Sequence, residues 1–439
     1  MKKIRMRFGI GLMLTGLLAA SCQDHPIDSP TPADPSAYPA EVVTSWLNLQ
    51  LRLTQTTPAS PLVAARRFAY SGIAVYESLV PGLPAYQSIA PKLNGLPALP
   101  KPDQKESYYW PACANAAFAA MSRAFFTTTS AANKASMDSL ETALLNEYRK
   151  VRTNEELARS ETFGKQIAAA VLDWAKTDGN DNTTPYTPPT GDGLWVPTPP
   201  ANAAAAFPNW GKNRPLVKGS DAGADPGAPT PFSKDPASPY YAQVKEVYDL
   251  SKKLTDEQKT IALFWADSPD GKSLGGGHWH AILHQILLKE RSNLGQAATA
   301  YARLGLAMSD ACISLFKSKY TYNAVRPITY IRTVMNQADW NTLFPTPNHP
   351  EYPSGHTVLS AAAAHALGQS FGENYRFRDN SYQYLGFAPR DFDSFEKAVV
   401  EVGLSRVYAG LHYRKTCEVS LHQGKTVSQN IANQLRFRK

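Results

Sequence analysis

The distribution of proline is the strongest constraint on how this 439-residue chain can fold. Residues 178–239 are dense in proline, with runs such as Thr-Pro-Tyr-Thr-Pro-Pro and Asp-Pro-Ala-Ser-Pro. Proline fixes φ and lacks a backbone N–H, so this stretch fits neither a helix interior nor a central strand. Four large aromatic residues interrupt it: Trp195, Phe207, Trp210 and Phe232. We therefore expect a segment strapped onto the protein surface rather than a free linker.

Apolar residues recur at helical spacing on both sides of this segment, while the alternation typical of strands is scarce. The spacing predicts helices over residues 42–51, 62–79, 112–126, 134–151, 157–174, 241–253, 256–265, 278–289, 295–316, 357–370, 393–404 and 418–435. The predicted fold is all-α, a large helical body of two helical bundles. We expect one helical region over residues 40–177 and a second over 240–439.

The first residues have the composition of a bacterial export signal. A basic start, an apolar stretch over residues 8–20 and small residues up to Ser21 precede Cys22. This pattern predicts a cleaved signal over 1–21, of the lipoprotein type, with Cys22 as the lipidated residue. Residues 22–39, rich in Pro, Asp and Ser, would form a tether. We expect an exported outer-membrane or cell-surface lipoprotein, or alternatively a periplasmic or secreted protein, with membrane contact only through the lipid.

Charge and cysteine content exclude some classes of function. Removing the four basic residues of the signal lowers the formal net charge from +8 to +4, and no basic run remains, so nucleic acid is not an expected partner. Three cysteines remain in the mature chain: Cys113, Cys312 and Cys417. They have no CxxC spacing, so they form either one disulfide or three buried thiols.

Three short segments in the C-terminal half carry groups that suit a tetrahedral oxyanion. The first holds Lys319 and Arg326, which on one helix would share a face, with Pro327 expected to end that helix. The guanidinium of arginine can bind two oxygens of an anion, while lysine adds a point charge. Solvated basic residues are the ordinary alternative for such a pair.

The other two segments add a helix start and two imidazoles. Ser354 and Gly355 precede an alanine-rich helical stretch, and backbone N–H groups at a helix N-terminus favour an anion. The serine could instead cap that helix. His356 follows as a candidate acid or base. In the third segment Arg406 is followed six residues later by His412, and a break at the intervening glycine would turn the histidine inward.

Together these segments match the pattern K-x6-RP, PSGH and SR-x5-H. The chain therefore resembles the vanadium-dependent haloperoxidases and their relatives, the type 2 phosphatidic acid phosphatases and bacterial acid phosphatases. The likeness is strongest to secreted bacterial haloperoxidases. It extends to residues 264–267, to His278-Trp279 and to residues 67–77, and it covers most of the mature chain.

This resemblance implies a vanadate cofactor and a reaction of hydrogen peroxide with bromide or iodide, followed by transfer of the halogen to a small organic acceptor. It also implies site residues. Vanadate would be bound by Lys319, Arg326, Ser354, Gly355 and Arg406. His412 would be the axial vanadium ligand, His356 would assist protonation of bound peroxide, and Lys319 would withdraw electron density.

Two positions bear on how far the resemblance holds. The family often has Asp four residues after the axial histidine, whereas this chain has Thr416, and Glu418 could replace it only if the backbone curls. A carboxylate at that place normally orients the ring and raises its basicity. His349, seven residues before His356, occupies a place that is Phe in chloroperoxidases and His in algal bromoperoxidases, which favours bromide or iodide.

Three other interpretations stay open. Phosphate has the shape of vanadate, so the same residues suit a soluble phosphomonoesterase with His412 as nucleophile and His356 as acid. A non-catalytic lipoprotein with an anion pocket is a further possibility. Finally, His278, His280 and His284 are spaced for a zinc site, but they lack the glutamate of H-E-x-x-H, so packing is the default expectation.

Overall fold

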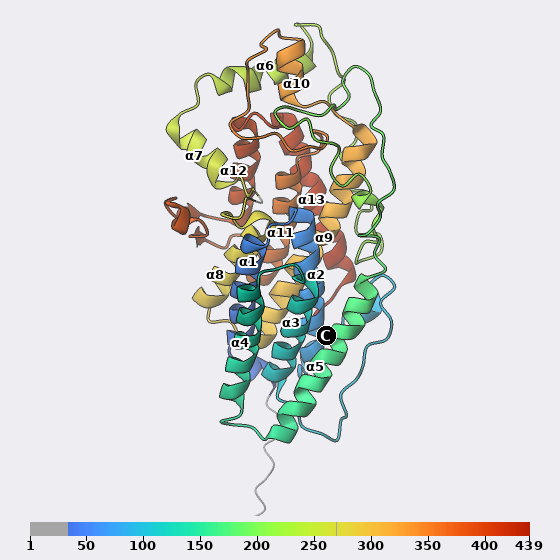
Figure 1. The fold of residues 1–439 in the computed structure, drawn as a ribbon, viewed down its shortest axis with the longest axis vertical. Helices are drawn as coiled ribbons and strands as arrows, with labels where there is room; N and C mark the ends of the chain where they lie inside the picture. The colour runs from blue at the N-terminus through green and yellow to red at the C-terminus, as the bar shows by residue number, and fades with distance from the viewer. Residues whose placement is uncertain (1–33, 269) are drawn as a thin grey trace, which may run out of the picture. The chain divides into compact units, whose positions relative to one another are not determined.

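The computed structural model describes residues 34–268 and 270–439, so the predicted signal, Cys22 and most of the tether lie outside it. The described chain is built from helices and one small antiparallel pair of strands (Figure 1). This confirms the all-α prediction. The helices are α1 (Glu41–Thr56), α2 (Pro61–Leu79), α3 (Trp110–Phe125), α4 (Ala131–Tyr148), α5 (Asn154–Ala175), α6 (Pro239–Ser251), α7 (Asp256–Phe264), α8 (His278–Lys289), α9 (Leu294–Tyr322), α10 (Pro327–Thr333), α11 (Gly355–Phe371), α12 (Phe395–Tyr408) and α13 (Arg414–Gln434).

The long helix α9 connects the two halves of the chain. It begins at a capping box formed by Asn293 and Gln296, and most of its residues are buried. It packs against α2 from the N-terminal half and against α11 and α13 from the C-terminal half (Figure 1). A Cβ on Gly72 or Gly305 would lie 2.8 or 2.7 Å from a backbone Cα of the opposite helix, so glycine permits the close approach of α2 and α9.

The proline-rich segment lies against these helices with almost no regular structure of its own. Between residues 178 and 238 the only helical element is the 3-10 turn Trp210–Lys212. Trp195 is 1% exposed. The carboxylate of Asp310, inside α9, accepts hydrogen bonds from the backbone N–H groups of Leu216 and Val217 at 2.7 and 3.0 Å. Buried aromatic rings and one buried carboxylate thus hold the segment down.

Three short elements, two strands and one helix, escaped prediction from the sequence. Strands β1 (Phe377–Asp379) and β2 (Arg390–Phe392) pair over three residues each, too short to show alternation. Helix α10 is seven residues long, or about two turns, and is likewise too short to show its periodicity. Within residues 34–268 and 270–439, no helix has the length and apolar character required to cross a membrane.

The close packing of α11 against α13 can be tested by mutation. A Cβ on Gly424 of α13 would lie 2.0 Å from the carbonyl oxygen of Val358 in α11. We therefore expect Gly424→Ala to lower the free energy of unfolding by about 1–3 kcal/mol, since the helices must separate. Urea denaturation measures this. As a control, Gly368→Ala in α11 places its Cβ at 3.6 Å from the nearest atom and should not destabilise. Equal stability of the two variants would contradict the close packing.

Candidate active site

Lys319 and Arg326 meet in space, but they do not lie on one helix as the sequence suggested. Helix α9 ends at Tyr322, because Asn323 adopts the left-handed conformation with φ 45° and caps it. Pro327 is the first residue of α10, where its missing N–H costs nothing, and Arg326 is the N-cap residue. The chain therefore turns between the two cations, and the turn rather than helical periodicity directs both side chains inward.

Lys319 is fully buried and supplies charge to this site. Its Nζ donates to the carbonyl oxygens of Pro350, Glu351 and Pro353 at 2.7, 3.1 and 2.5 Å. Burial, and next the charge of Arg326, lower the pKa of Lys319. Three N–H donors, however, exist only in the ammonium form, so the hydrogen-bond geometry requires the charged lysine.

The two arginines are buried as well. Arg326 is 0% exposed and Arg406 is 1% exposed. Burial lowers the pKa of each to about 10, which leaves both charged at neutral pH. Arg326 donates to the carbonyl oxygens of His349 and Leu411 at 2.9 and 3.1 Å, and Arg406 donates to that of Trp265 at 3.1 Å. The Nε of Arg406 is buried without a hydrogen-bond partner.

His412 lies beyond the end of α12, turned inward by the break predicted at Gly410, whose φ is +79°. Its Nε2 is 3.3 Å from the Nη1 of Arg326, so this nitrogen presents its lone pair to the cations. Burial and the nearby Arg326 and Lys319 hold the pKa of His412 well below its usual range. The imidazole is therefore neutral, with Nε2 free of a proton.

The carboxylate partner of His412 is Glu351, a residue that the sequence analysis missed. The Nδ1 of His412 lies 2.9 Å from its Oε1, and Thr416 donates to its Oε2 at 3.1 Å. Thr416 thus orients the carboxylate rather than replacing it, and Glu418 is exposed beside Lys415. The only signal was an acidic residue among prolines five positions before His356.

Glu351 is 1% exposed and fits the ionised form. Burial raises its pKa to about 7, while Arg326 and Lys319 act in the opposite direction. The backbone N–H of Tyr413 also donates to its Oε1, at 3.3 Å, so three donors face its two oxygens. Because the carboxylate accepts from Nδ1–H, it fixes the tautomer that leaves Nε2 available.

The predicted helix start at the second segment is present. Ser354 is the N-cap residue of α11, yet its hydroxyl makes no capping bond and instead lies 3.0 Å from the hydroxyl of Thr357. The Nε2 of His356 lies 3.2 Å from the carbonyl oxygen of Ala266. Burial, and next the charge of Arg406, lower the pKa of His356 to about 3. Gly355 and His356 are both on the wall of the cavity described below.

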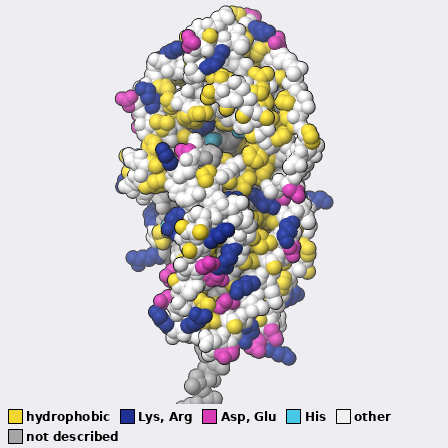
Figure 2. Space-filling view, viewed as in Figure 1, with side chains coloured by type: hydrophobic (Ala, Val, Ile, Leu, Met, Phe, Trp, Pro, Cys, Tyr) yellow, Lys and Arg dark blue, Asp and Glu magenta, His cyan; other side chains and the backbone are white. Residues whose placement is uncertain are grey.

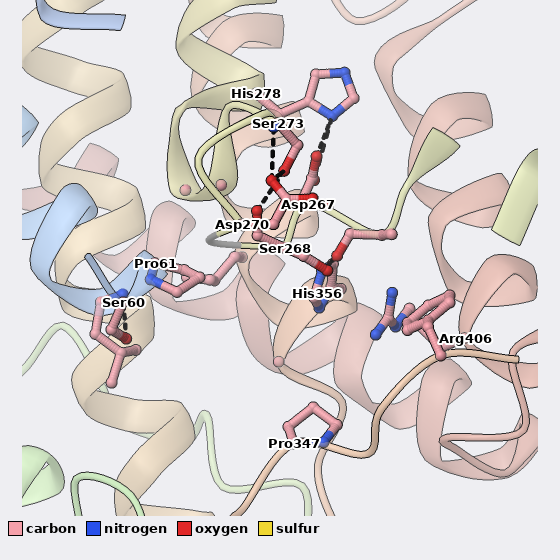
Figure 3. A pocket seen from close by; sticks show the side chains of 18 of the residues that line it. Ser60, Pro61, Asp267, Ser268, Asp270, Ser273, His278, Pro347, His356 and Arg406 are labelled. Carbon is pink, nitrogen blue, oxygen red and sulfur yellow. Dashed lines mark hydrogen bonds and ion pairs between the residues drawn. The ribbon is translucent and has the colours of Figure 1, made fainter. Parts of the chain in front are cut away.

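Residues 265–267 support this side of the site through their backbone. The carbonyl oxygens of Trp265 and Ala266 contact Arg406 and His356, respectively. The next residue, Asp267, has φ 45° and is held by the ring of His278, whose Nδ1 is 2.9 Å from Oδ1 (Figure 3). The other ring nitrogen of His278 lies 2.8 Å from Asp379. Two carboxylates therefore clamp one imidazole and fix the segment.

The three clustered histidines do not converge on one point. His278 is held by the clamp, while the ring of His280 stacks on Phe68 with centroids 3.9 Å apart and is fully buried. Among the described residues, no group of three or more His, Cys, Asp or Glu is arranged to hold a metal ion. Cys113, Cys312 and Cys417 are buried free thiols, so the disulfide alternative is wrong for this structure.

A cavity of about 830 Å³ opens above these residues. Its wall includes Gly355, His356, Arg406 and His412, and also His349, whose Nδ1 is 3.1 Å from the Nη2 of Arg326. Figure 2 shows a hollow on this face of the molecule, with histidine inside and hydrophobic side chains around it. The structure thus brings every predicted site residue of the three segments to one place.

The charges of this place fit an oxyanion. Lys319, Arg326 and Arg406 are buried with one buried carboxylate, Glu351, among them. The nearby Asp267 is already paired with His278. The excess positive charge and the unpartnered Nε of Arg406 are the groups that a tetrahedral anion satisfies. The neutral Nε2 of His412 adds a ligand atom for a metal centre within that anion.

Comparison with known proteins identifies the family to which an anion site of this kind belongs. Residues 299–438 match a family model described as the VCPO second helical-bundle domain. The structure of a bacterial vanadium-dependent iodoperoxidase is similar with a TM-score of 0.83 and 32% sequence identity, covering 92% of this chain and 98% of the other. None of the curated proteins matches significantly.

Two structures of a bacterial vanadium-dependent chloroperoxidase share the fold at 16% identity. The holo form has a TM-score of 0.66 and covers 87% of this chain and 93% of its own, and the apo form has 0.64, 86% and 94%. The chain belongs to the vanadium-dependent haloperoxidases. It is a peroxidase-type enzyme, and its cofactor is vanadate.

The pair His412–Glu351 generates the first prediction for this site. Glu351→Gln keeps the shape of the side chain but removes the charge that raises the basicity of His412. We expect vanadate to bind about 10–100-fold more weakly, measured by calorimetric titration of the apoprotein with vanadate. Glu418→Gln is the matched control, since Glu418 is exposed, and should bind as the wild type does. Weaker binding by the control variant alone would contradict the assignment of Glu351.

The clamp on His278 generates a second prediction. Burial lowers the pKa of His278, but Asp267 and Asp379 outweigh it and raise the pKa to about 10. A folded pKa above the unfolded value of about 6.5 stabilises the fold fully below pH 6.5, and that stability is lost as the pH rises to 10. Wild type should be more stable than His278→Gln. The difference between their free energies of unfolding should fall between pH 6.5 and 10, by at most about 1.4 kcal/mol per pH unit. Urea denaturation at several pH values measures it, and a pH-independent difference would mean that the ring is neutral.

Proposed function

We propose that this protein oxidises iodide or bromide with hydrogen peroxide to hypohalous acid. The observation that carries the proposal is the neutral imidazole of His412, which lies on the wall of an open cavity and close to three buried cations, Arg326, Lys319 and Arg406. This arrangement combines a ligand atom, an excess of positive charge and access from solvent. The similar iodoperoxidase structure supports the same reaction class.

In this proposal Arg326, Arg406 and the charge of Lys319 hold the vanadate oxygens, together with the Ser354 hydroxyl and the Gly355 N–H. Gly355 is the first residue of α11, and a helix N-terminus favours an anion. His412 would hold vanadium through Nε2, while Glu351 holds the ring in the required tautomer. When bound, vanadate would supply Lewis-acid chemistry for the activation of hydrogen peroxide.

We assign the proton transfers of the reaction to His356. Its pKa of about 3 means that it is neutral in the structure described here, and after burial the largest cause is Arg406. An anion bound to Arg406 would offset that charge and shift His356 toward its protonated form. The carbonyl oxygen of Ala266 keeps the ring in place.

The order in which we propose to test the halides rests on the surroundings of Arg326. His349 places its Nδ1 3.1 Å from the Nη2 of that arginine and meets Phe316 edge-on, with ring centroids 5.5 Å apart. Burial and then Lys319 hold the pKa of His349 well below its usual range, so the ring is neutral. A neutral polar ring at this position, together with the iodoperoxidase likeness, makes iodide the first halide to test and bromide the second.

The test is a halogenation assay on the vanadate-loaded protein. We expect peroxide and iodide to give triiodide, and peroxide and bromide to brominate a phenolic dye. His412→Ala removes the proposed ligand and should lower the rate by at least about 100-fold. His422→Ala, an exposed histidine on α13, is the matched control and should retain full activity.

The same residues also suit hydrolysis of a phosphomonoester, with His412 as nucleophile and His356 as acid. A parallel assay with p-nitrophenyl phosphate separates the two reactions. Turnover of the ester without halogenation after vanadate loading would overturn the haloperoxidase proposal in favour of the phosphatase. Failure of both reactions would favour an anion-binding protein without catalysis.

A further inference from the structure

The cavity above the anion site is larger than halide and peroxide require. Pockets that hold organic ligands typically measure about 300–1,000 Å³. The volume of about 830 Å³ lies within this range, and of the three buried cations only Arg406 is part of the wall. The remaining wall is mostly apolar, with aromatic rings from separate parts of the chain: Phe207, Trp279, Phe316, Phe344 and Phe387.

Hydrophobic side chains also surround the opening. Phe207, Leu263 and Leu385 are 39%, 45% and 39% exposed, and all three line the cavity. They come from the proline-rich segment, from α7 and from the 3-10 turn Gln383–Leu385. Single exposed hydrophobic residues are ordinary, but three that converge on one opening from distant segments mark a binding surface.

One of these residues is held in a strained conformation. Phe207 has φ 53°, which residues with a large side chain rarely adopt. The backbone N–H of its neighbour Ala206 donates to the carbonyl oxygen of Asn348 at 2.8 Å. The ring of Phe207 meets that of Trp210 edge-on, with centroids 5.7 Å apart. Strain of this kind persists where surrounding structure imposes it, and it is found at ligand sites.

The two carboxylates of the upper cavity already accept hydrogen bonds from the protein. Asp267 is held by His278 and Tyr382, and Asp270 accepts from the backbone N–H groups of Lys272 and Ser273 at 2.9 and 2.8 Å (Figure 3). The carboxylates of Asp267 and Asp270 on the wall disfavour an anionic ligand, and Arg406 on the same wall disfavours a cationic one, whereas a flat apolar ring meets aromatic edges and faces. The chemistry of the wall therefore selects a neutral aromatic molecule.

We propose that the upper cavity binds a neutral aromatic acceptor, such as a phenol, so that it is halogenated before the oxidised halogen escapes. The proposal rests on the proposed haloperoxidase function. In the step itself, hypohalous acid gives its halogen to a ring carbon: a C–X bond forms, the O–X bond breaks, and the ring proton and the hydroxide leave as water.

The test uses 2-naphthol as the aromatic probe and two variants at the opening, Leu263→Asp and Leu385→Asp. Each places a charge where the ring would pass or pack. We expect the Kd for 2-naphthol, measured by calorimetry without peroxide, to rise at least about tenfold in each variant. The ratio of iodonaphthol to triiodide formed in turnover should fall by a similar factor.

Leu288→Asp is the matched control, because Leu288 is 56% exposed on α8 and does not line the cavity. It should leave both the Kd and the product ratio unchanged. The proposal is overturned if wild type shows no saturable binding of 2-naphthol, or if both cavity variants behave as the control does. Loss of triiodide formation in wild type with naphthol binding intact would instead contradict the haloperoxidase function alone.

Discussion

The burial of three positive side chains at one point is the constraint on which the rest of the structure depends. Moving a charge from water into a protein interior costs several kcal/mol unless partners replace the lost hydration. Lys319 donates hydrogen bonds to three carbonyl oxygens and Arg326 to two others. The carboxylate of Glu351, which holds His412, adds a buried negative charge. The loop before α11 supplies most of these oxygens, so its backbone must follow the cations closely. A site that binds a highly charged anion is therefore built largely from backbone.

The clamp on His278 serves the same purpose on the opposite side. Its ring is the central member of a row with Asp267 and Asp379, and none of the three is more than 13% exposed. Because Asp267 ends the segment whose carbonyl oxygens contact His356 and Arg406, the clamp helps to position these two functional side chains. Positioning of this kind reduces the reorganisation that the site undergoes when an anion binds.

The sequence predicted the fold class, the long helices and the residues of the three segments, because helical periodicity and the PSGH pattern are local properties. It misplaced Lys319 and Arg326 on one helix, since only the left-handed cap at Asn323 shows that α9 ends earlier. It also looked for the carboxylate partner of His412 after that residue. Glu351 lies 61 positions before His412 in the chain, and only the tertiary fold brings them within 2.9 Å. Partners supplied from distant segments leave no periodic signal.

The proline-rich segment has a consequence for how such an enzyme can diversify. Through Ala206 and Phe207 it forms part of the cavity wall, yet it contributes none of the cations and neither of the histidines His356 and His412. Its irregular backbone owes its position to a few anchors, such as the hydrogen bonds to Asp310, rather than to a repeating ladder. Substitutions or changes of length between those anchors can reshape the entrance while the buried charges stay fixed. Selectivity for the acceptor can thus evolve separately from the chemistry that oxidises the halide.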